Sequence, residues 1–293
     1  MKEIVSISGK GGTGKTSITA ALGSIAGESV VMADCDVDAA NLHLLLRPDI
    51  TKEYDFWGSK IPVFNNSGCT NCGECRLICR FNAIEYNHDG YFVNNLECEG
   101  CSLCYYICPE KVISMKQNKS GKFFISRSRF GSPFIFARLD PAKNNSGKLV
   151  FEVKTAAKEA AQKDGINLIL IDGPPGIGCP AISSLSGASL VLIITEATLS
   201  GLSDLERMLE VINNFNLHAV CIINKANLNT HVAEQIIMLC NVHEIDVIGQ
   251  ISFDETFSKS LETGKTLMET GNTKLKRQMT KVWDELTKRI NQL

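Results

Sequence analysis

Residues 8–17, which read SGKGGTGKTS, constrain the fold of this chain more than any other stretch. The apolar segment EIVSIS (3–8) precedes them and a helical pattern from about 16 to 26 follows. A glycine-rich loop between a strand and a helix can surround a phosphate with backbone N–H groups, and the helix N-terminus adds positive charge. The sequence therefore predicts a nucleotide-binding loop made of Gly9, Lys10, Gly11, Gly12, Thr13, Gly14, Lys15, Thr16 and Ser17.

The loop follows the pattern G-x-x-x-x-G-K-T and adds one lysine to it. In that pattern Lys15 reaches the β- and γ-phosphates, and the Thr16 hydroxyl can ligate Mg²⁺. Lys10 is the addition, five residues before Lys15. It is either a solvated loop lysine or a second positive charge for the phosphates.

Short apolar segments alternate with helical patterns over most of the chain, and this alternation predicts a mainly parallel α/β sheet covered on both faces. The expected strands are 3–8, 29–34, 166–172, 189–195, 219–224 and 245–252, and the expected helices are 16–26, 149–163, 200–215 and 230–241. We expect a doubly wound nucleotide-binding domain formed by residues 1–60 and 118–293. A small α+β domain, 61–117, is inserted into it, and 118–148 form the return path.

Composition and charge narrow the classes of partner. Lys and Arg number 30 against 32 Asp and Glu, so the formal charge of −2 predicts no nucleic-acid surface. No segment approaches the roughly 18 apolar residues of a membrane helix, and the start MKEIVSIS reads as a strand with no signal peptide. We expect a cytoplasmic protein. The amphipathic tail LKRQMTKVWDELTKRINQL (275–293) is expected to pack on the sheet, and membrane binding is the less favoured reading.

Eight of the twelve cysteines lie between Cys69 and Cys108, in two runs with the spacing C-x₂-C-x₂-C-x₃-C. In a reducing compartment, clustered cysteines more often bind metal than form disulfides. Paired CxxC units could bind zinc, but each run here offers three closely spaced cysteines and a fourth. The runs resemble those of bacterial two-cluster ferredoxins, which implies two [4Fe–4S] clusters with the fourth ligand exchanged between runs. The ligand sets would be Cys69, Cys72, Cys75 and Cys108 for one cluster, and Cys98, Cys101, Cys104 and Cys79 for the other.

The segment KGGTGKT resembles the deviant Walker A motif of the MinD/ParA/nitrogenase iron-protein class of P-loop ATPases. In that class the extra lysine reaches across a homodimer interface, so Lys10 would act on the partner's nucleotide together with Lys15 in each subunit. The resemblance also places switch I in DCDVDAAN (34–41), where Asp36 would orient the attacking water and Asp34 would lie behind Mg²⁺. It places switch II at the end of LILIDGPPG (168–176), with Asp172 in the Mg²⁺ shell and the backbone of Gly173, Pro174, Pro175 and Gly176 sensing the γ-phosphate.

Two further positions bear on ligand choice. NKAN (224–227) has Asn227 where guanine-specific proteins carry the aspartate of N-K-x-D, so we expect ATP and ADP rather than GTP, with Asn224 contacting adenine. Cys179 follows Asp172 by seven residues, as a cluster-binding cysteine does in the nitrogenase iron protein. Its pair across a dimer axis could hold a labile metal or cofactor, or Cys179 is a small residue at a helix start. Cys35, Cys221 and Cys240 are expected in the core.

Together these features predict a homodimeric, Mg·ATP-dependent ATPase that carries two [4Fe–4S] clusters. Its nucleotide cycle would be coupled either to electron transfer to a partner protein or to assembly of iron–sulfur or other metal cofactors on that partner. The alternative is a MinD-like positioning ATPase in which the clusters only brace the fold.

Overall fold

The computed structural model describes residues 1–141, 143 and 145–293, and these divide into two compact units. The larger unit comprises residues 1–53, 123–138 and 146–293, and the smaller unit comprises 54–122 and 139–145. The border between the units therefore falls inside two long strands, β3 (Asp49–Phe64) and β6 (Ile113–Arg127).

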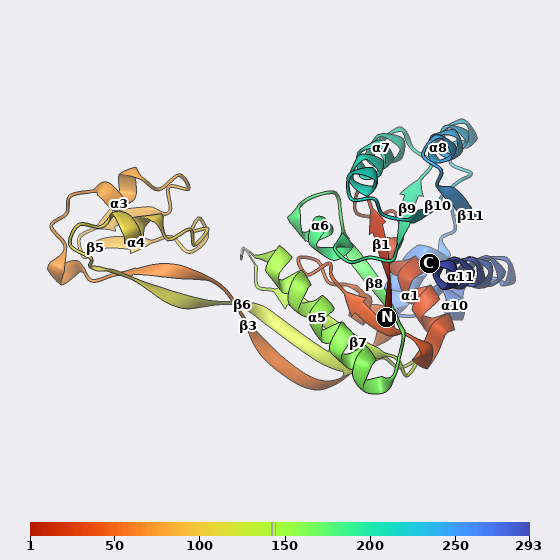
Figure 1. Cartoon of the computed structure of the whole chain (residues 1–293), viewed down its shortest axis with the longest axis horizontal. Helices are drawn as coiled ribbons and strands as arrows, with labels where there is room; N and C mark the ends of the chain where they lie inside the picture. Colours follow the sequence, from red (N-terminus) through yellow and green to blue (C-terminus); the bar gives the residue numbers. More distant parts are fainter. Residues whose placement is uncertain (142, 144) are drawn as a thin grey trace. The chain divides into compact units, whose positions relative to one another are not determined.

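A nine-stranded sheet in the order β11-β10-β9-β1-β8-β2-β7-β6-β3 organises the larger unit (Figure 1). The parallel pairings of β1 with β8 and β9, of β2 with β8, and of β10 with β9 and β11 confirm the predicted mainly parallel α/β sheet. The strands, besides β3 and β6, are β1 (Lys2–Ser8), β2 (Val31–Asp34), β7 (Pro133–Leu139), β8 (Leu168–Pro175), β9 (Leu190–Glu196), β10 (Ala219–Asn224) and β11 (Asp246–Gln250).

Helices cover both faces of the sheet because successive strand residues point to opposite sides and most are apolar. Ile4, Met32 and Leu170 share one core with α1 and α11, while α5 and α6 lie on the opposite face (Figure 1). The helices of this unit are α1 (Lys15–Ala26), α2 (Leu42–Leu46), α5 (Ser146–Asp164), α6 (Cys179–Leu185), α7 (Leu199–Asn214), α8 (Thr230–Val242), α9 (Thr256–Thr263), α10 (Leu267–Thr270) and α11 (Thr273–Gln292), with a 3₁₀ turn at Gly27–Ser29.

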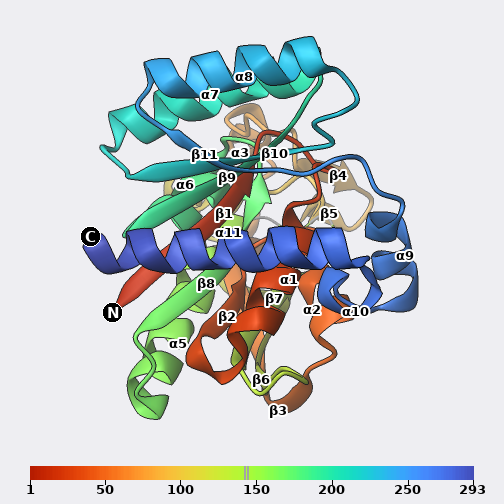
Figure 2. The same ribbon diagram turned by 90° about the vertical axis from the view of Figure 1, so that its right-hand side faces the viewer.

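The C-terminal helix α11 packs against α1, as its amphipathic sequence predicts (Figure 2). Its apolar residues at helical spacing, Leu275, Met279, Val282, Leu286 and Ile290, are all buried in the core. In the part of the chain that the structure describes, no helix combines the length and apolar character needed to cross a bilayer.

Residues 118–148, expected to form the return path, hold a strand that the sequence analysis did not predict. The chain forms the rest of β6 and then β7, which pairs in parallel with β2 through Met32–Phe134 and Asp34–Phe136. Phe134, Ile135 and Phe136 are buried on both faces of the sheet, so they lack the alternation that marks a half-exposed strand. Residues 142 and 144 of that stretch lie outside the described residues.

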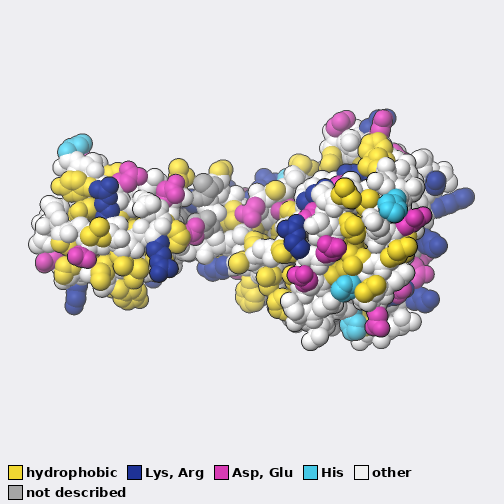
Figure 3. All heavy atoms as spheres, turned by 90° about the horizontal axis from the view of Figure 1, so that it is seen from above, with side chains coloured by type: hydrophobic (Ala, Val, Ile, Leu, Met, Phe, Trp, Pro, Cys, Tyr) yellow, Lys and Arg dark blue, Asp and Glu magenta, His cyan; other side chains and the backbone are white. Residues whose placement is uncertain are grey.

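The smaller unit has little regular structure. It holds α3 (Glu74–Leu77), α4 (Leu103–Ile107), the antiparallel pair β4 (Ile84–Asn87) and β5 (Gly90–Val93), and a 3₁₀ turn at Asn66–Gly68. Its core consists of Cys75, Ile84, Tyr91, Cys104 and Ile113. Figure 3 shows hydrophobic side chains interspersed with charged groups on the surface; the exposed apolar residues of this unit include Leu77, Leu96 and Tyr106.

A candidate nucleotide site and two cysteine-lined cavities

The predicted loop lines a cavity at the carboxyl end of β1. Gly9 is not among the residues that line the cavity, and an added Cβ there would collide with Asp204 on α7. Asp36 and Asn41 from the loop after β2, Pro175 from β8 and Leu261 from α9 complete its walls. The cavity is lined by Ser8, Lys10, Gly11, Gly12, Thr13, Gly14, Lys15, Thr16, Ser17, Asp36, Ala39, Asn41, Pro175 and Leu261.

Asn224 contacts the backbone of the loop and does not line the cavity. Its Nδ2 donates to the Thr13 carbonyl at 2.7 Å, and its Oδ1 accepts from the Lys225 N–H at 2.9 Å. Gly14 allows this approach, because its φ is +92° and a Cβ there would lie 2.5 Å from the Asn224 amide nitrogen. The amide thus already has a donor and an acceptor contact to the backbone. The adenine contact predicted for Asn224 stays a prediction.

Lys15, Thr16 and Asp172 converge at the start of α1. Lys15 Nζ lies 2.7 Å from Asp172 Oδ1, and the Thr16 hydroxyl donates to Asp172 Oδ2 at 2.7 Å. Burial disfavours the charged form of Lys15, but the neighbouring carboxylates of Asp172, Asp36 and Asp34 outweigh it and raise the pKa of Lys15. The structure therefore brings together the hydroxyl and the carboxylate that were predicted to share a Mg²⁺ shell.

Asp34 and Asp172 are register partners on the adjacent strands β2 and β8. Asp34 is fully buried and accepts the N–H groups of Asp36 at 3.0 Å and Leu42 at 3.1 Å, so it fixes both ends of the predicted switch I. Burial and the nearby Asp172 carboxylate raise the pKa of Asp34 well above its ordinary value. Burial likewise raises the pKa of Asp36, which faces the cavity.

Three carboxyl groups around one lysine make a site with surplus negative charge. A divalent cation with oxygen ligands would relieve this repulsion, and Thr16 and Asp172 fit Mg²⁺ as its ligands, with the charges of Asp34 and Asp36 nearby. The backbone N–H groups of the loop and Lys15 supply the opposite charge, which fits a phosphate chain. The residues present therefore suit a magnesium–nucleotide pair.

The predicted switch II runs along the end of β1. A Cβ at Gly173 would lie 2.8 Å from the Ser6 carbonyl, so a glycine is needed for this close approach. Gly176 donates its N–H to the Ser8 carbonyl at 2.8 Å, and Pro174 and Pro175 stand between these two anchors. The segment is thus tied to the strand that feeds the loop.

Lys10 forms an ion pair within its own chain. Its Nζ lies 2.7 Å from Glu196 Oε1 and 2.5 Å from the Ser200 hydroxyl. Lys225 holds the other oxygen of Glu196 at 2.6 Å and also donates to the Gly12 carbonyl. Burial pushes the pKa of Glu196 upward, but hydrogen bonds from Lys10 and Lys225 outweigh it and hold that pKa below its ordinary value.

The sequence analysis did not single out Glu196, Lys225 or the α9 residues beside the loop. Glu196 ends β9, and side chains at the carboxyl ends of parallel strands often face the ligand, so its position was a usable signal. Phe257 and Leu261 lie on a helix that the sequence analysis did not predict; Leu261 lines the cavity, and the ring of Phe257 lies beside Gly14.

In the smaller unit, the eight clustered cysteines gather in two groups of four. Each group surrounds a separate, mainly apolar cavity. Each includes the last cysteine of the opposite run: Cys108 stands with the first run and Cys79 with the second. The groups are Cys69, Cys72, Cys75 and Cys108, and Cys98, Cys101, Cys104 and Cys79.

The thiols in these cavities suit a ligand that replaces their protons. Burial, and then the neighbouring sulfurs, raises the pKa of Cys75 and raises the pKa of Cys104 to about 11, so both keep their protons unless a cation displaces them. None of the twelve cysteines, all within the described residues, forms a disulfide. The Asn71 N–H lies 3.4 Å from the Cys69 sulfur.

Among the described residues, no three His, Cys, Asp or Glu side chains converge closely enough to share one metal ion. A four-iron cubane asks for a wider arrangement, because each thiolate binds a different iron. Four thiols around an apolar cavity fit such a group.

The remaining cysteines occupy two environments. Cys179 is exposed and begins α6, directly after switch II. Cys35, Cys221 and Cys240 are fully buried, which confirms their expected place in the core.

Comparison with known proteins identifies a family and several similar proteins. Residues 4–267 match the family described as the CobQ/CobB/MinD/ParA nucleotide binding domain. An uncharacterized protein of Methanocaldococcus jannaschii is 34% identical over 229 residues, covering 78% of this chain and 79% of that protein. The septum site-determining protein MinD of Pyrococcus horikoshii, solved with Mg-ADP, has a TM-score of 0.57 at 19% identity, covering 98% of this chain and 96% of that one.

Shorter matches fall on subunits of other proteins. The ferredoxin oxidoreductase 1 subunit ForD of Aquifex aeolicus is 44% identical over 43 residues, covering 14% of this chain and 54% of that subunit. The pyruvate synthase subunit PorD of Methanothermobacter marburgensis is 30% identical over 63 residues, covering 22% of this chain and 74% of that subunit.

Proposed function

Because the chain belongs to the CobQ/CobB/MinD/ParA nucleotide-binding family of P-loop ATPases, we propose that it is a homodimeric, Mg·ATP-dependent ATPase that controls electron transfer to a partner protein. One observation carries the redox part of this proposal. The same chain holds a phosphate-binding loop and two cavities, each surrounded by four thiols. A positioning ATPase would need only the first of these.

The residues of the nucleotide site divide the work of hydrolysis. The loop N–H groups and Lys15 bind the phosphates, while Thr16 and Asp172 hold the magnesium shell, with Asp34 behind it. Asp36 lines the cavity, where its carboxylate accepts a hydrogen bond from the attacking water. Lys10 of the partner subunit stabilises the charge that develops on the transferred phosphoryl group, as an arginine finger does.

The smaller unit provides the redox chemistry. Its eight cysteines hold the two cubanes, which when bound supply one-electron transfer at low potential. The apolar walls, including Tyr91 and Ile84, keep water from the buried sulfur atoms of Cys75 and Cys104 and so help to set that potential. Electron transfer to the partner would require a low-potential one-electron donor and a one-electron acceptor on that partner. The short similarities to the ForD and PorD subunits support the redox part of the proposal.

The decisive measurement is a redox titration of anaerobically reconstituted protein, with and without Mg·ATP. We expect nucleotide to shift at least one cluster potential, and identical potentials in both conditions would contradict the gating. Iron and sulfide analysis should give about eight of each per chain. Cys75→Ser and Cys104→Ser should each reduce this to about four, whereas Cys221→Ser, a buried core cysteine, should leave it unchanged.

Assembly of metal cofactors on a partner is the alternative outcome. In that case Mg·ATP would leave the cluster potentials unchanged, and adding an apo-acceptor protein to the same sample would cause an ATP-dependent loss of iron to that acceptor. Cys179, exposed beside switch II, is the residue to substitute in that case.

A further inference from the structure

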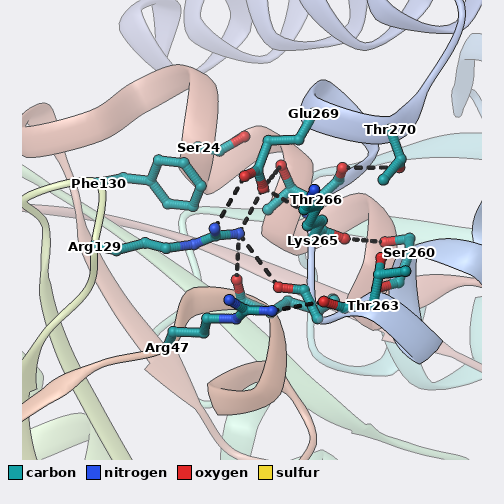
Figure 4. Close-up of polar contacts among 12 residues, drawn as sticks. Ser24, Arg47, Arg129, Phe130, Ser260, Thr263, Lys265, Thr266, Glu269 and Thr270 are labelled. Carbon is teal, nitrogen blue, oxygen red and sulfur yellow. Dashed lines mark hydrogen bonds and ion pairs between the residues drawn. The ribbon is translucent and has the colours of Figure 1, made fainter.

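Arg129, in the turn between β6 and β7, links three separate segments of the larger unit (Figure 4). Its guanidinium binds both carboxylate oxygens of Glu269, with Nη1 to Oε1 at 2.9 Å and Nη2 to Oε2 at 2.5 Å. The same Nη2 donates to the Leu45 carbonyl at 3.0 Å and lies 3.4 Å from the Gly264 carbonyl. Such a fork-to-fork pair fixes direction as well as distance.

Arg47 adds a second contact to the same place. It follows the last residue of α2 and donates from Nη2 to the Thr263 carbonyl, at the end of α9, at 2.6 Å. Gly264 leaves room for it, since a Cβ there would lie 3.0 Å from the Arg47 guanidinium. We call Arg47, Arg129 and Glu269 the arginine clamp.

Glu269 is held from its other side as well. Its Oε2 accepts from the Thr266 N–H at 2.8 Å and from the Thr266 hydroxyl at 3.0 Å, which closes a capping box at the start of α10. The Glu269 carboxylate therefore caps the N-terminus of α10 and binds Arg129 at the same time. The α9–α10 junction cannot shift without moving the Arg129 guanidinium or breaking these bonds.

Two segments that line the nucleotide cavity continue along the chain to residues that the arginine clamp binds. Asp36 and Asn41 line the cavity, and the chain then enters α2, whose end is bound by Arg129 at Leu45. Leu261 lines the cavity from α9, and the clamp holds the two residues that close that helix, Thr263 and Gly264.

The clamp also stands where the chain leaves the larger unit. β3 begins at Asp49, just after Arg47, and β6 ends at Arg127, just before Arg129. These are the strands inside which the border with the smaller unit falls. The clamp thus connects both cavity walls to the bases of the strands that carry the chain to the cysteine cavities.

We propose that Arg129 is a positioning residue that transmits nucleotide binding from α2 and α9 to the bases of β3 and β6. This inference rests on the proposed function, because it assumes that nucleotide binds in the loop cavity. Nucleotide contacts draw α2 and α9 together around the cavity, and the clamp passes that movement to residues 49–53 and 123–127.

Hydrogen exchange of the anaerobically reconstituted full chain, with and without Mg·AMPPNP, tests the proposal. In the wild type we expect the analogue to slow exchange in the loop 9–17 and, by about tenfold, at 49–53 and 123–127. Arg129→Gln and the isosteric Glu269→Gln should keep the slow exchange of the loop and lose the response of both strand bases. Arg129→Lys should not rescue it, because one ammonium cannot reach the same acceptors in a planar fork.

Arg127→Gln is the matched control, since Arg127 lies two residues away and binds Gly131 and Asp164 instead. It should retain both responses. If the loop responds and the strand bases respond equally in Arg129→Gln, the clamp proposal is overturned while nucleotide binding stands. Strand bases that do not respond in the wild type also overturn it. A wild-type loop that shows no slowing overturns nucleotide binding itself, and the clamp proposal with it.

Discussion

Glu196 binds Lys10 within one chain, with 2.7 Å between Lys10 Nζ and Glu196 Oε1. Under the proposed function this ammonium must instead reach a nucleotide bound to the partner subunit. Glu196 and that phosphate then compete for the same charge. The contact would hold Lys10 back until a partner with bound nucleotide arrives, which makes dimer formation dependent on nucleotide.

Glu196→Gln should tighten the nucleotide-dependent dimer, because a neutral amide holds Lys10 less strongly. Because the Lys10 side chain is 36% exposed, we expect the free energy of dimerisation to become more favourable by only about 1 kcal/mol, which is about a fivefold lower dissociation constant of the dimer. Sedimentation velocity over a concentration series with Mg·AMPPNP measures it. Glu210→Gln, at an exposed position of α7, is the control. A dimer that is unchanged or weaker in Glu196→Gln would refute the competition.

Asp36→Asn should slow ATP hydrolysis by about a hundredfold or more, because an amide is a far weaker proton acceptor than a carboxylate. Nucleotide affinity should change little, since Lys15 and the loop N–H groups remain. Phosphate release gives the rate and calorimetry gives the affinity. Asp38→Asn changes an exposed acid two residues away and should hydrolyse ATP normally. Equal rates in the two variants would remove Asp36 from the mechanism.

His43 should make the protein less stable in acid. Its ring stacks on Phe136 at 5.6 Å between centroids, and burial followed by the charge of Arg138 lowers the pKa of His43 to about 4. The unfolded chain, with a histidine pKa near 6.5, binds more protons between these values. Stability is therefore present above about pH 6.5 and is lost as the pH falls toward 4.

The expected loss is about 1 kcal/mol, since His43 is only half-buried and solvent screens its charge. Urea unfolding at pH 7 and pH 5 measures it. His43→Phe keeps the stacking and should show a smaller drop than the wild type, whereas His231→Phe, exposed on α8, should match the wild type. The same drop in all three proteins would show that His43 has no part in it.

Leu286→Ala should destabilise the larger unit by about 2–5 kcal/mol, the usual cost of a cavity in a packed core. Leu286 is fully buried between α11 and the core that α1 shares. Denaturant unfolding measures the change, and Lys288→Ala, exposed on the same helix, should change stability by less than about 0.5 kcal/mol. A helix that only docks on membranes would leave both variants equally stable.

Much of the fold could be predicted because its signals lie in contiguous residues. Lys15 and Thr16 follow a strand and open a helix, and the grouping of Cys108 with the first cysteine run agrees with what the resemblance of the runs to two-cluster ferredoxins implies. The apolar spacing of α11 likewise predicts its buried face. The strand β7 was not predicted, because it is short and buried on both sides and its partner β2 lies far away in sequence.

The sequence by itself determined which chemistry the chain can support: a phosphate loop, the acids Asp34 on β2 and Asp172 on β8, and two sets of four thiols. Only the tertiary structure decided which distant residues hold those groups in place. Asn224 behind Thr13, Glu196 beside Lys10, and Glu269 on Arg129 are contacts between segments widely separated along the chain. Such pairs depend on strand order and register. A local sequence pattern marks where a strand ends, but it does not encode which other strand lies beside it.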